Sequence, residues 1–327
     1  MIKKMLISLI FIITLISCTL PRPPYKPMSY PETTTSKKII FNNVLILSGG
    51  AVNGIFSVGV LNGYFENHPS TRFDAISGTS IGSLVSSFAF INHTDLAYEA
   101  FKNLKGEDIT GEMQMENLVK ANSLSNPQAI KSLIAKFITN DIIDEVAAQS
   151  EGRYLFINST NLDTGSMVVF DMTEIARQKQ YDRYRTVLQA SCSIPIIFPP
   201  VFLDGAMYYD GGLVRNMFFP YSLEPNVDKD TAVLIIENGR RDGTELGTME
   251  TRNSLLGISS RILAIVDDAS KQGSYEHVDH ELRGKHYFCE IPVTAPLLGF
   301  NFKKEDLEKL YSAGVAEGKK IPLDITK

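Results

Sequence analysis

The chain has 327 residues, of which 44% are hydrophobic and 21% charged, and its formal net charge is −5. These proportions are typical of a globular protein and exclude a disordered chain, a collagen-like chain and a membrane protein with many spans. The weakly acidic charge lacks the basic footprint of a nucleic-acid binder, and three cysteines are too few for a disulfide scaffold. The length favours one large domain, or one domain with a cap.

Residues 1–17 have the features of a bacterial lipoprotein signal peptide. Lys3 and Lys4 precede an apolar run, Met5–Ile16, which is shorter than the roughly 20 residues that span a bilayer. The run leads into a serine and then Cys18, which resembles the lipobox, where a cysteine is lipidated and becomes the mature N-terminus. We therefore expect lipidation of Cys18. An ordinary cleavable signal that happens to end near a cysteine is the alternative.

Residues 18–38 follow the signal and are rich in proline and threonine, with little that a core would bury. We expect this segment to be a tether between the lipid and the folded domain. Lipidation would anchor the protein in a bacterial cell envelope. Thr19 stands where an aspartate would signal retention in the inner membrane, so the outer membrane is favoured if the host has two.

From residue 39 onward, apolar β-branched runs alternate with stretches that have helical spacing. The runs predict strands at Ile39–Phe41 with Val44–Leu47, Phe73–Ser77, Tyr154–Asn158, Met167–Phe170, Val201–Leu203, Met207–Tyr209, Ala232–Glu237 and Tyr287–Val293. The spacing predicts helices at Asn53–Phe65, Ile81–Phe90, Tyr181–Ala190, Asn253–Leu282 with a break near Gly273, and Lys304–Ala316. It also predicts a mostly helical stretch over Thr94–Val146, in which Asn126 and Pro127 are the N-cap and first turn of a helix. This alternation predicts an α/β fold, in which helices cover both faces of a mostly parallel sheet.

The segment Gly78–Gly82 has the G-x-S-x-G spacing, with Ser80 at its centre. It follows a predicted strand and opens a predicted helix, which is the context that a nucleophile elbow requires. Flanking glycines allow a sharp turn that exposes the hydroxyl, and the helix N-terminus favours negative charge there. The alternative is that Ser80 only caps the helix.

A second glycine-rich segment, Ser48–Gly54, also joins a predicted strand to a predicted helix. Backbone N–H groups in such a loop point at an anion, which would suit either a nucleotide phosphate or an oxyanion. Ala51 interrupts the G-x-G-x-x-G pattern and no P-loop lysine follows, so an oxyanion hole is the better interpretation.

Asp204-Gly205 predicts a hairpin between the strands Val201–Leu203 and Met207–Tyr209. A third segment, Asp210-Gly211-Gly212, comes directly after this hairpin and places a carboxylate at a strand end, although many turns have the same composition. A Ser-His-Asp triad of the α/β-hydrolase order would need a late histidine, and His286 is a weak candidate for it. Because no histidine lies in a motif-like setting, a carboxylate base is favoured.

The polar stretch around His277, Asp279, His280 and Glu281 has a spacing that is compatible with a metal, but a solvated helix face is the favoured interpretation. Neither the H-E-x-x-H motif nor a calcium-loop spacing occurs. We therefore expect no metal and no cofactor.

Several motifs, in family order and spread over about residues 40–240, resemble those of the patatin-like phospholipases. They are Leu47–Gly54 for the oxyanion loop, Gly78–Gly82 for the serine elbow, Asn161–Gly165 for an internal hairpin, and Ala190–Pro195, Phe198–Pro200 and Tyr209–Gly212 for the block with the aspartate. The resemblance implies a three-layer α/β sandwich with a mostly parallel central sheet. It also implies a catalytic domain over residues 39–240. Residues 241–327 carry no recognisable motif of that family, and we expect them to pack on the same domain as an α/β extension.

The resemblance further implies a Ser-Asp dyad, with Ser80 as nucleophile and Asp210 as base, and an oxyanion hole made by the N–H groups of Gly49, Gly50 and Ala51. The substrate would be a phospholipid or another acyl-ester lipid, as for a phospholipase A or lysophospholipase. Two departures matter: Ala51 replaces a third glycine, and Asn53 replaces an arginine or lysine, which puts a preference for anionic substrates in doubt.

Two alternatives remain open from the sequence. An acyltransferase would share the first half-reaction and differ only in the acceptor. A surface lipoprotein that binds partners without catalysis would need neither residue of the dyad, so the presence of both Ser80 and Asp210 argues against it. The predicted helices between Ile91 and Ser150 would either form a cap over an acyl pocket or pack against the rest of the domain in the ordinary way. Their apolar residues include Phe101, Leu118, Ile130, Leu133, Ile134 and Phe137. Nothing in the sequence indicates the oligomeric state.

Overall fold

The computed structural model describes residues 40–114, 116, 122–241 and 251–322. The signal peptide, the tether and Cys18 lie outside the described residues, so their assignment stays a prediction. None of the described helices is both long and apolar enough to span a bilayer.

The centre of the fold is an eight-stranded sheet in the order β5-β6-β3-β2-β1-β7-β8, with β4 paired to β3 off this path. Its strands are β1 Asn43–Leu47, β2 Ala75–Gly78, β3 Tyr154–Asn161, β4 Ser166–Asp171, β5 Val201–Leu203, β6 Ala206–Asp210, β7 Ala232–Glu237 and β8 Lys285–Glu290. Five neighbouring strands, β3, β2, β1, β7 and β8, run parallel. Strands β4 and β6 are antiparallel to β3, and β5 is antiparallel to β6, so this side of the sheet is antiparallel.

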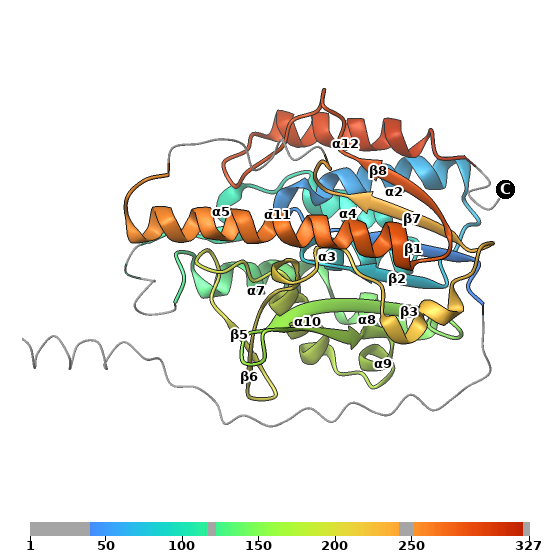
Figure 1. The fold of residues 1–327 in the computed structure, drawn as a ribbon, viewed down its shortest axis with the longest axis horizontal. Helices are drawn as coiled ribbons and strands as arrows, with labels where there is room; N and C mark the ends of the chain where they lie inside the picture. The colour runs from blue at the N-terminus through green and yellow to red at the C-terminus, as the bar shows by residue number, and fades with distance from the viewer. Residues whose placement is uncertain (1–39, 115, 117–121, 242–250, 323–327) are drawn as a thin grey trace, which may run out of the picture.

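Helices flank both faces of this sheet (Figure 1). The α-helices are α2 Gly54–Asn67, α3 Ile81–Phe90, α4 Thr94–Phe101, α5 Gly106–Thr110, α7 Pro127–Phe137, α8 Asn140–Ala148, α9 Met172–Arg177, α10 Tyr181–Ser191, α11 Leu255–Glu281 and α12 Lys304–Gly318. Three 3₁₀-helices, η1 Ala51–Asn53, η2 Gly211–Leu213 and η3 Tyr221–Asn226, lie in the connections.

Successive side chains of β1 point to two separate cores. Leu45 and Leu47 join the larger core, which includes residues of α2, α3, α7 and α10. Val44 and Ile46 join a smaller core with residues of α11, such as Val278. This alternation is the period of two that a strand imposes, and it explains why β1 reads as continuously apolar. The predicted α/β fold with a mostly parallel, helix-covered sheet is therefore confirmed.

Helices α2 and α12 lie side by side with their backbones in close contact (Figure 1). A Cβ atom built on Gly59 of α2 would lie 2.3 Å from the carbonyl oxygen of Tyr311, and one on Gly314 of α12 would lie 2.4 Å from that of Phe56. Only glycine permits this approach. The contact packs a helix from the C-terminal part of the chain against α2, which begins at the glycine-rich loop.

Three expectations about element bounds were wrong. Helix α11 continues for 27 residues through Gly273 without the predicted break. A glycine costs a helix only about 1 kcal/mol relative to alanine, and burial of Tyr275 and Val278 against the sheet outweighs that cost. The last strand is Lys285–Glu290 instead of Tyr287–Val293, because its register is set by pairing with β7.

The first strand also differs, since β1 begins only at Asn43. Phe41 is buried in the smaller core, but it lies before the paired residues. Its N–H donates to the carbonyl of Asn226 in the η3 connection at 2.9 Å. An apolar residue can therefore be part of the core without being part of the ladder.

Candidate active site

Ser80 lies in a strained turn between β2 and α3. Its φ of 52° and ψ of −125° are unusual for a residue other than glycine, and its side chain makes no capping hydrogen bond. A Cβ atom on Gly78 would lie 2.5 Å from the carbonyl oxygen of Gly82, and one on Gly82 would lie 2.5 Å from that of Ser48. Both glycines are therefore required by the turn, as the elbow interpretation predicts, and the simple capping interpretation does not fit.

Asp210 lies at the end of β6, and strand β3 brings it to Ser80. In the parallel pair of β2 and β3, Gly78 lies opposite Ile157, and two residues further along β3, Ser159 lies opposite Asp210. The Ser80 hydroxyl donates to Asp210 Oδ2 at 2.6 Å, across 130 positions of sequence. The two side chains, at 5% and 6% exposure, are almost fully buried. The sequence prediction that these two residues meet agrees with this geometry.

Burial raises the pKa of Asp210 from its ordinary value to about 7. Two hydrogen bonds oppose that rise, one from the Ser80 hydroxyl and one from the N–H of Gly212, which reaches Oδ1 at 2.8 Å. The carboxylate of Asp267 on α11 adds a smaller upward contribution to the pKa. A carboxyl group with a pKa near neutrality is a much better proton acceptor than one in water.

The glycine-rich loop touches the serine. A Cβ atom on Gly49 would lie 3.2 Å from the Ser80 Cβ and 2.5 Å from Asn216 Oδ1. Gly50 has a φ of 151° and Ala51 a φ of 51°, so the backbone turns sharply here. Within the described part of the chain, the N–H groups of Gly50 and Ala51 donate no hydrogen bond. These two groups are therefore available to a ligand at Ser80.

The N–H of Gly49, in contrast, is occupied by Asn216, donating to its side-chain oxygen at 3.1 Å and to its carbonyl at 3.3 Å. Asn216 is 2% exposed, and its Nδ2 is buried without a hydrogen-bond partner among the described residues. The sequence reasoning missed this residue. Its only local signal is its place six positions after Asp210, which does not reveal the contact with Gly49.

Asn53 has a structural partner of its own. Its side chain accepts from the N–H of Leu298 at 2.8 Å and donates to the carbonyl of Leu298 at 3.3 Å. These hydrogen bonds of Asn53 therefore connect the start of α2 to the segment before α12.

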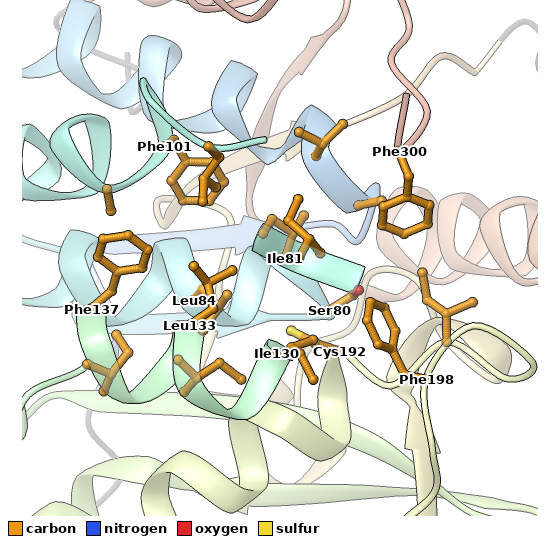
Figure 2. A pocket seen from close by; sticks show the side chains of 18 of the residues that line it. Ser80, Ile81, Leu84, Phe101, Ile130, Leu133, Phe137, Cys192, Phe198 and Phe300 are labelled. Atoms are coloured by element: carbon orange, nitrogen blue, oxygen red, sulfur yellow. The ribbon is translucent and has the colours of Figure 1, made fainter. Parts of the chain in front are cut away.

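An apolar cavity opens on one side of Ser80 (Figure 2). Among its described lining residues, only Ser80 and Cys192 have a side-chain atom other than carbon. The lining comprises Ala51, Val52, Ser80, Ile81, Leu84, Phe88, Ala100, Phe101, Leu104, Ile109, Ile130, Leu133, Ile134, Phe137, Ile138, Cys192, Ile194, Phe198 and Phe300. Figure 2 shows Phe198 and Phe300 near Ser80, and Phe101 and Phe137 at the opposite end.

The lining of the apolar cavity includes residues of the segment that was expected to form a cap. All the apolar residues predicted for it between Ile91 and Ser150 line the cavity, except Leu118, which lies outside the described residues. Cys192 is buried there, and burial raises the pKa of its thiol, so the sulfur stays protonated. Cys192 and Cys289 are both free thiols.

A polar cleft opens on the other side of Ser80. The glycine-rich loop, Asp210 and Asn216 line it, and helix α11 forms a wall with Leu263, Ala264, Asp267 and Lys271. Lys271 Nζ lies 3.0 Å from Asp267 Oδ2. Both residues were missed in the sequence, where α11 carries no recognisable motif.

Among the described lining residues of both cavities there is no histidine. His286 lies in β8 at the far edge of the sheet, so its weak candidacy as a triad base is wrong. His277 is 5% exposed, so the solvated helix face expected for it is also wrong. Helix α11 turns this residue inward, next to the η3 connection, where its Nε2 lies 3.7 Å from Glu224 Oε1.

Comparison with known proteins gives relatives of low identity. A family model described as patatin-like phospholipase matches residues 45–222. An uncharacterized protein of Acanthamoeba polyphaga mimivirus is 23% identical over 300 residues, which are 87% of this chain and 95% of that protein. A probable lipid hydrolase of Invertebrate iridescent virus 6 is 25% identical over 58% of this chain and 65% of its own length.

A lysophospholipase of Yarrowia lipolytica is 27% identical over 68% of this chain, but the match covers only 15% of that protein. Among solved structures, VipD from Legionella pneumophila aligns with 92% of this chain and 70% of its own, at 13% identity and a TM-score of 0.41. The chain therefore spans nearly all of one relative and a small part of another.

Proposed function

Since the chain belongs to the patatin-like phospholipase family, a family of hydrolases, we propose that it cleaves lipid esters with Ser80 and Asp210 as a catalytic dyad. The observation that carries this proposal is the 2.6 Å hydrogen bond from the Ser80 hydroxyl to Asp210 Oδ2, at the boundary between an apolar cavity and a polar cleft. An ester of a long-chain acid has the same division, with a hydrocarbon on one side of the carbonyl and a polar alcohol on the other.

In this mechanism the Ser80 oxygen attacks the ester carbonyl while Asp210 takes the hydroxyl proton. The negative charge on the carbonyl oxygen is held by the N–H groups of Gly50 and Ala51, with Asn216 Nδ2 as a third donor. Asp210 then gives its proton to the departing alcohol. Water attacks the acyl-serine in the second half, again with Asp210 as base, and releases the fatty acid.

Gly49 has a different part from the one expected of it. Because its N–H already donates to Asn216, its contribution is steric, allowing the loop to lie against Ser80. The sequence expectation of three loop donors becomes a proposal of two loop donors and one side-chain amide.

We also propose that the protein is anchored by a lipid on Cys18 in a bacterial cell envelope, close to its substrate. The support is the order of features in the first 18 residues, in which basic residues are followed by an apolar run and then by a small residue before Cys18. Metabolic labelling with a clickable fatty acid tests this, and loss of label in Cys18→Ser, with the serine protein still made, is the expected result. Equal labelling of the variant would contradict the anchor.

A lipid-panel assay tests the activity. Purified protein is incubated with phospholipids, lysophospholipids and neutral acylglycerols, and the products are resolved by mass spectrometry. Wild type should release fatty acid, and Ser80→Ala should release none above background. Ser86→Ala is the matched control, since Ser86 is a buried serine in α3, the helix that follows Ser80, and lines neither cavity.

The same assay separates hydrolysis from acyl transfer. With an added lysolipid acceptor, a hydrolase forms no diacyl product, whereas a transferase moves the acyl chain onto the lysolipid and forms diacyl product. If the folded protein hydrolyses no lipid in the panel, the result favours a binding module.

A further inference from the structure

Three potential metal ligands meet on the face of the sheet that α11 covers. Glu224 lies in η3, and His277 and Glu281 lie one turn apart on α11. One ligand atom from each residue lies within 4.8 Å of the others. None of the three lines the apolar cavity or the polar cleft at Ser80, so this cluster is separate from the proposed active site.

Two polar atoms in this cluster are buried without a hydrogen bond. Nδ1 of His277 and Oε1 of Glu224 have no hydrogen-bond partner among the described residues. His277 Nε2 and Glu224 Oε1 face each other at 3.7 Å, which exceeds a hydrogen bond. In a tetrahedral zinc site with bonds near 2.0–2.1 Å, ligand atoms lie about 3.3 Å apart. A small inward movement of His277 Nε2 and Glu224 Oε1 would therefore let these two atoms share one cation.

The charges of the cluster also favour a cation. Burial raises the pKa of Glu224, and the nearby Glu281 adds to that rise, so a positive charge beside this carboxyl group would stabilise its ionised form. Burial and Arg215 lower the pKa of His277, which keeps the imidazole neutral and able to ligate. The guanidinium of Arg215, which is close enough to lower the pKa of His277, donates to the carbonyl of Gly273.

We propose that Glu224, His277 and Glu281 bind a divalent transition-metal ion, with Zn²⁺ as the ion that this set of one imidazole and two carboxylates suits best. Open hollows lie on both sides of the cluster, one lined by Glu224, His280 and Glu281 and the other by Arg215, His277 and Glu281. Water from either side can complete the coordination.

The ion would have a structural effect. Glu224 belongs to the connection that runs from Asp210 to β7, and α11 forms the wall of the polar cleft. A metal shared by both would fasten α11 to the segment that follows the catalytic aspartate. Zinc binding should therefore raise the unfolding temperature, since a ligand that binds only the folded state stabilises it.

Isothermal titration of the untagged, metal-free full-length chain with ZnCl₂ tests the proposal, and Co²⁺ absorption in the visible region reports the ligand geometry. We expect one Zn²⁺ per chain and a higher unfolding temperature. Glu281→Gln, an exposed position, should weaken binding by about 100-fold or more and abolish the thermal shift. Glu224→Gln should do the same.

A neighbour on α11 provides a matched control. Asp279→Asn removes a carboxylate from an exposed position that belongs neither to the cluster nor to the two hollows beside it, and it should leave zinc affinity unchanged. The proposal is overturned if wild type binds no zinc in a 1:1 ratio. It is also overturned if Glu281→Gln binds zinc as wild type does, or if Asp279→Asn loses as much affinity.

Discussion

The two cavities that meet at Ser80 are built from different parts of the chain. The apolar cavity is lined mostly by α3, α7 and the segment between them, with Phe300 as its contribution from the C-terminal part. The polar cleft combines the glycine-rich loop and the segment around Asp210 with four residues of α11. One side of the nucleophile therefore excludes water and charge, and the other presents amides, carboxylates and a lysine.

This difference shows how the fold separates two tasks. An acyl chain gains free energy by leaving water, at about 25 cal/mol for each Å² buried, and needs no specific partner. Charge development at the ester carbonyl needs fixed donors and a base of suitable pKa. Substitutions in the two cavities should therefore have different signatures, with the largest effects at their boundary.

The largest effect is expected at the dyad itself. Asp210→Asn keeps the shape but removes the base, and Ser80→Ala removes the nucleophile, so each should lower kcat/KM for a lipid ester by at least about a thousandfold. The double variant should be little worse than either single one, because the residues act as a unit. Additive losses in steady-state kinetics would show that the two side chains act separately.

The next effect is expected at Asn216 in the polar cleft. Asn216→Asp keeps an acceptor for the N–H of Gly49 but replaces the amide donor with negative charge, so kcat should fall by about a hundredfold or more. KM should change little, because the donor acts on the transition state. A loss confined to KM would mean that Asn216 contacts only the ground-state substrate.

A smaller and selective effect is expected in the apolar cavity. Leu133 lies between Ser80 and Phe137, so Leu133→Trp should shorten the accepted acyl chain (Figure 2). The ratio of kcat/KM for long-chain over short-chain p-nitrophenyl esters should drop by about tenfold or more. Leu96→Trp is the control, because Leu96 is exposed and lines neither cavity. An equal loss for every chain length would place the acyl chain elsewhere.

The smallest effect is a shift in pH dependence. Asp210 acts as a base only when deprotonated, so kcat/KM should rise with pH through about 7, the value to which burial raises its pKa. Asp267→Asn removes a negative charge that contributes to the raised pKa of Asp210. It should therefore move the rising part of the pH profile of kcat/KM to lower pH. Asp268 is the neighbouring acid and lines neither cavity, so Asp268→Asn should leave the pH profile of kcat/KM unchanged. A pH profile that Asp267→Asn does not move would show that the charge of Asp267 does not act on Asp210.

The parts of the site that were predictable from the sequence are those in which local chemistry requires particular residues. Gly78 and Gly82 are needed by a turn in which larger side chains collide, and the bounds of α3 agree with the apolar spacing of Ile81–Phe90. Asp204 and Gly205 connect β5 to β6, as the Asp-Gly signal predicts. In these cases the interactions that decide the structure lie within a few residues.

The parts that were not predictable depend on distant contacts. The N–H of Gly49 is taken by a side chain 167 positions away, and nothing near Gly49 indicates it. The polar composition around His277 suggested a solvated face, although the rotation of α11 against the sheet buries this residue beside Glu224. Sequence periodicity gives the faces of a helix but does not identify the residues that each face meets.

The most direct test of the dyad is the labelling of the intact protein with a fluorophosphonate ester, followed by mass spectrometry of the adduct. The account predicts a single adduct on Ser80, formed at a rate that rises with pH through about 7 and falls at least about a thousandfold in Asp210→Asn. An adduct on another residue, or labelling of folded Asp210→Asn at the wild-type rate, would contradict it.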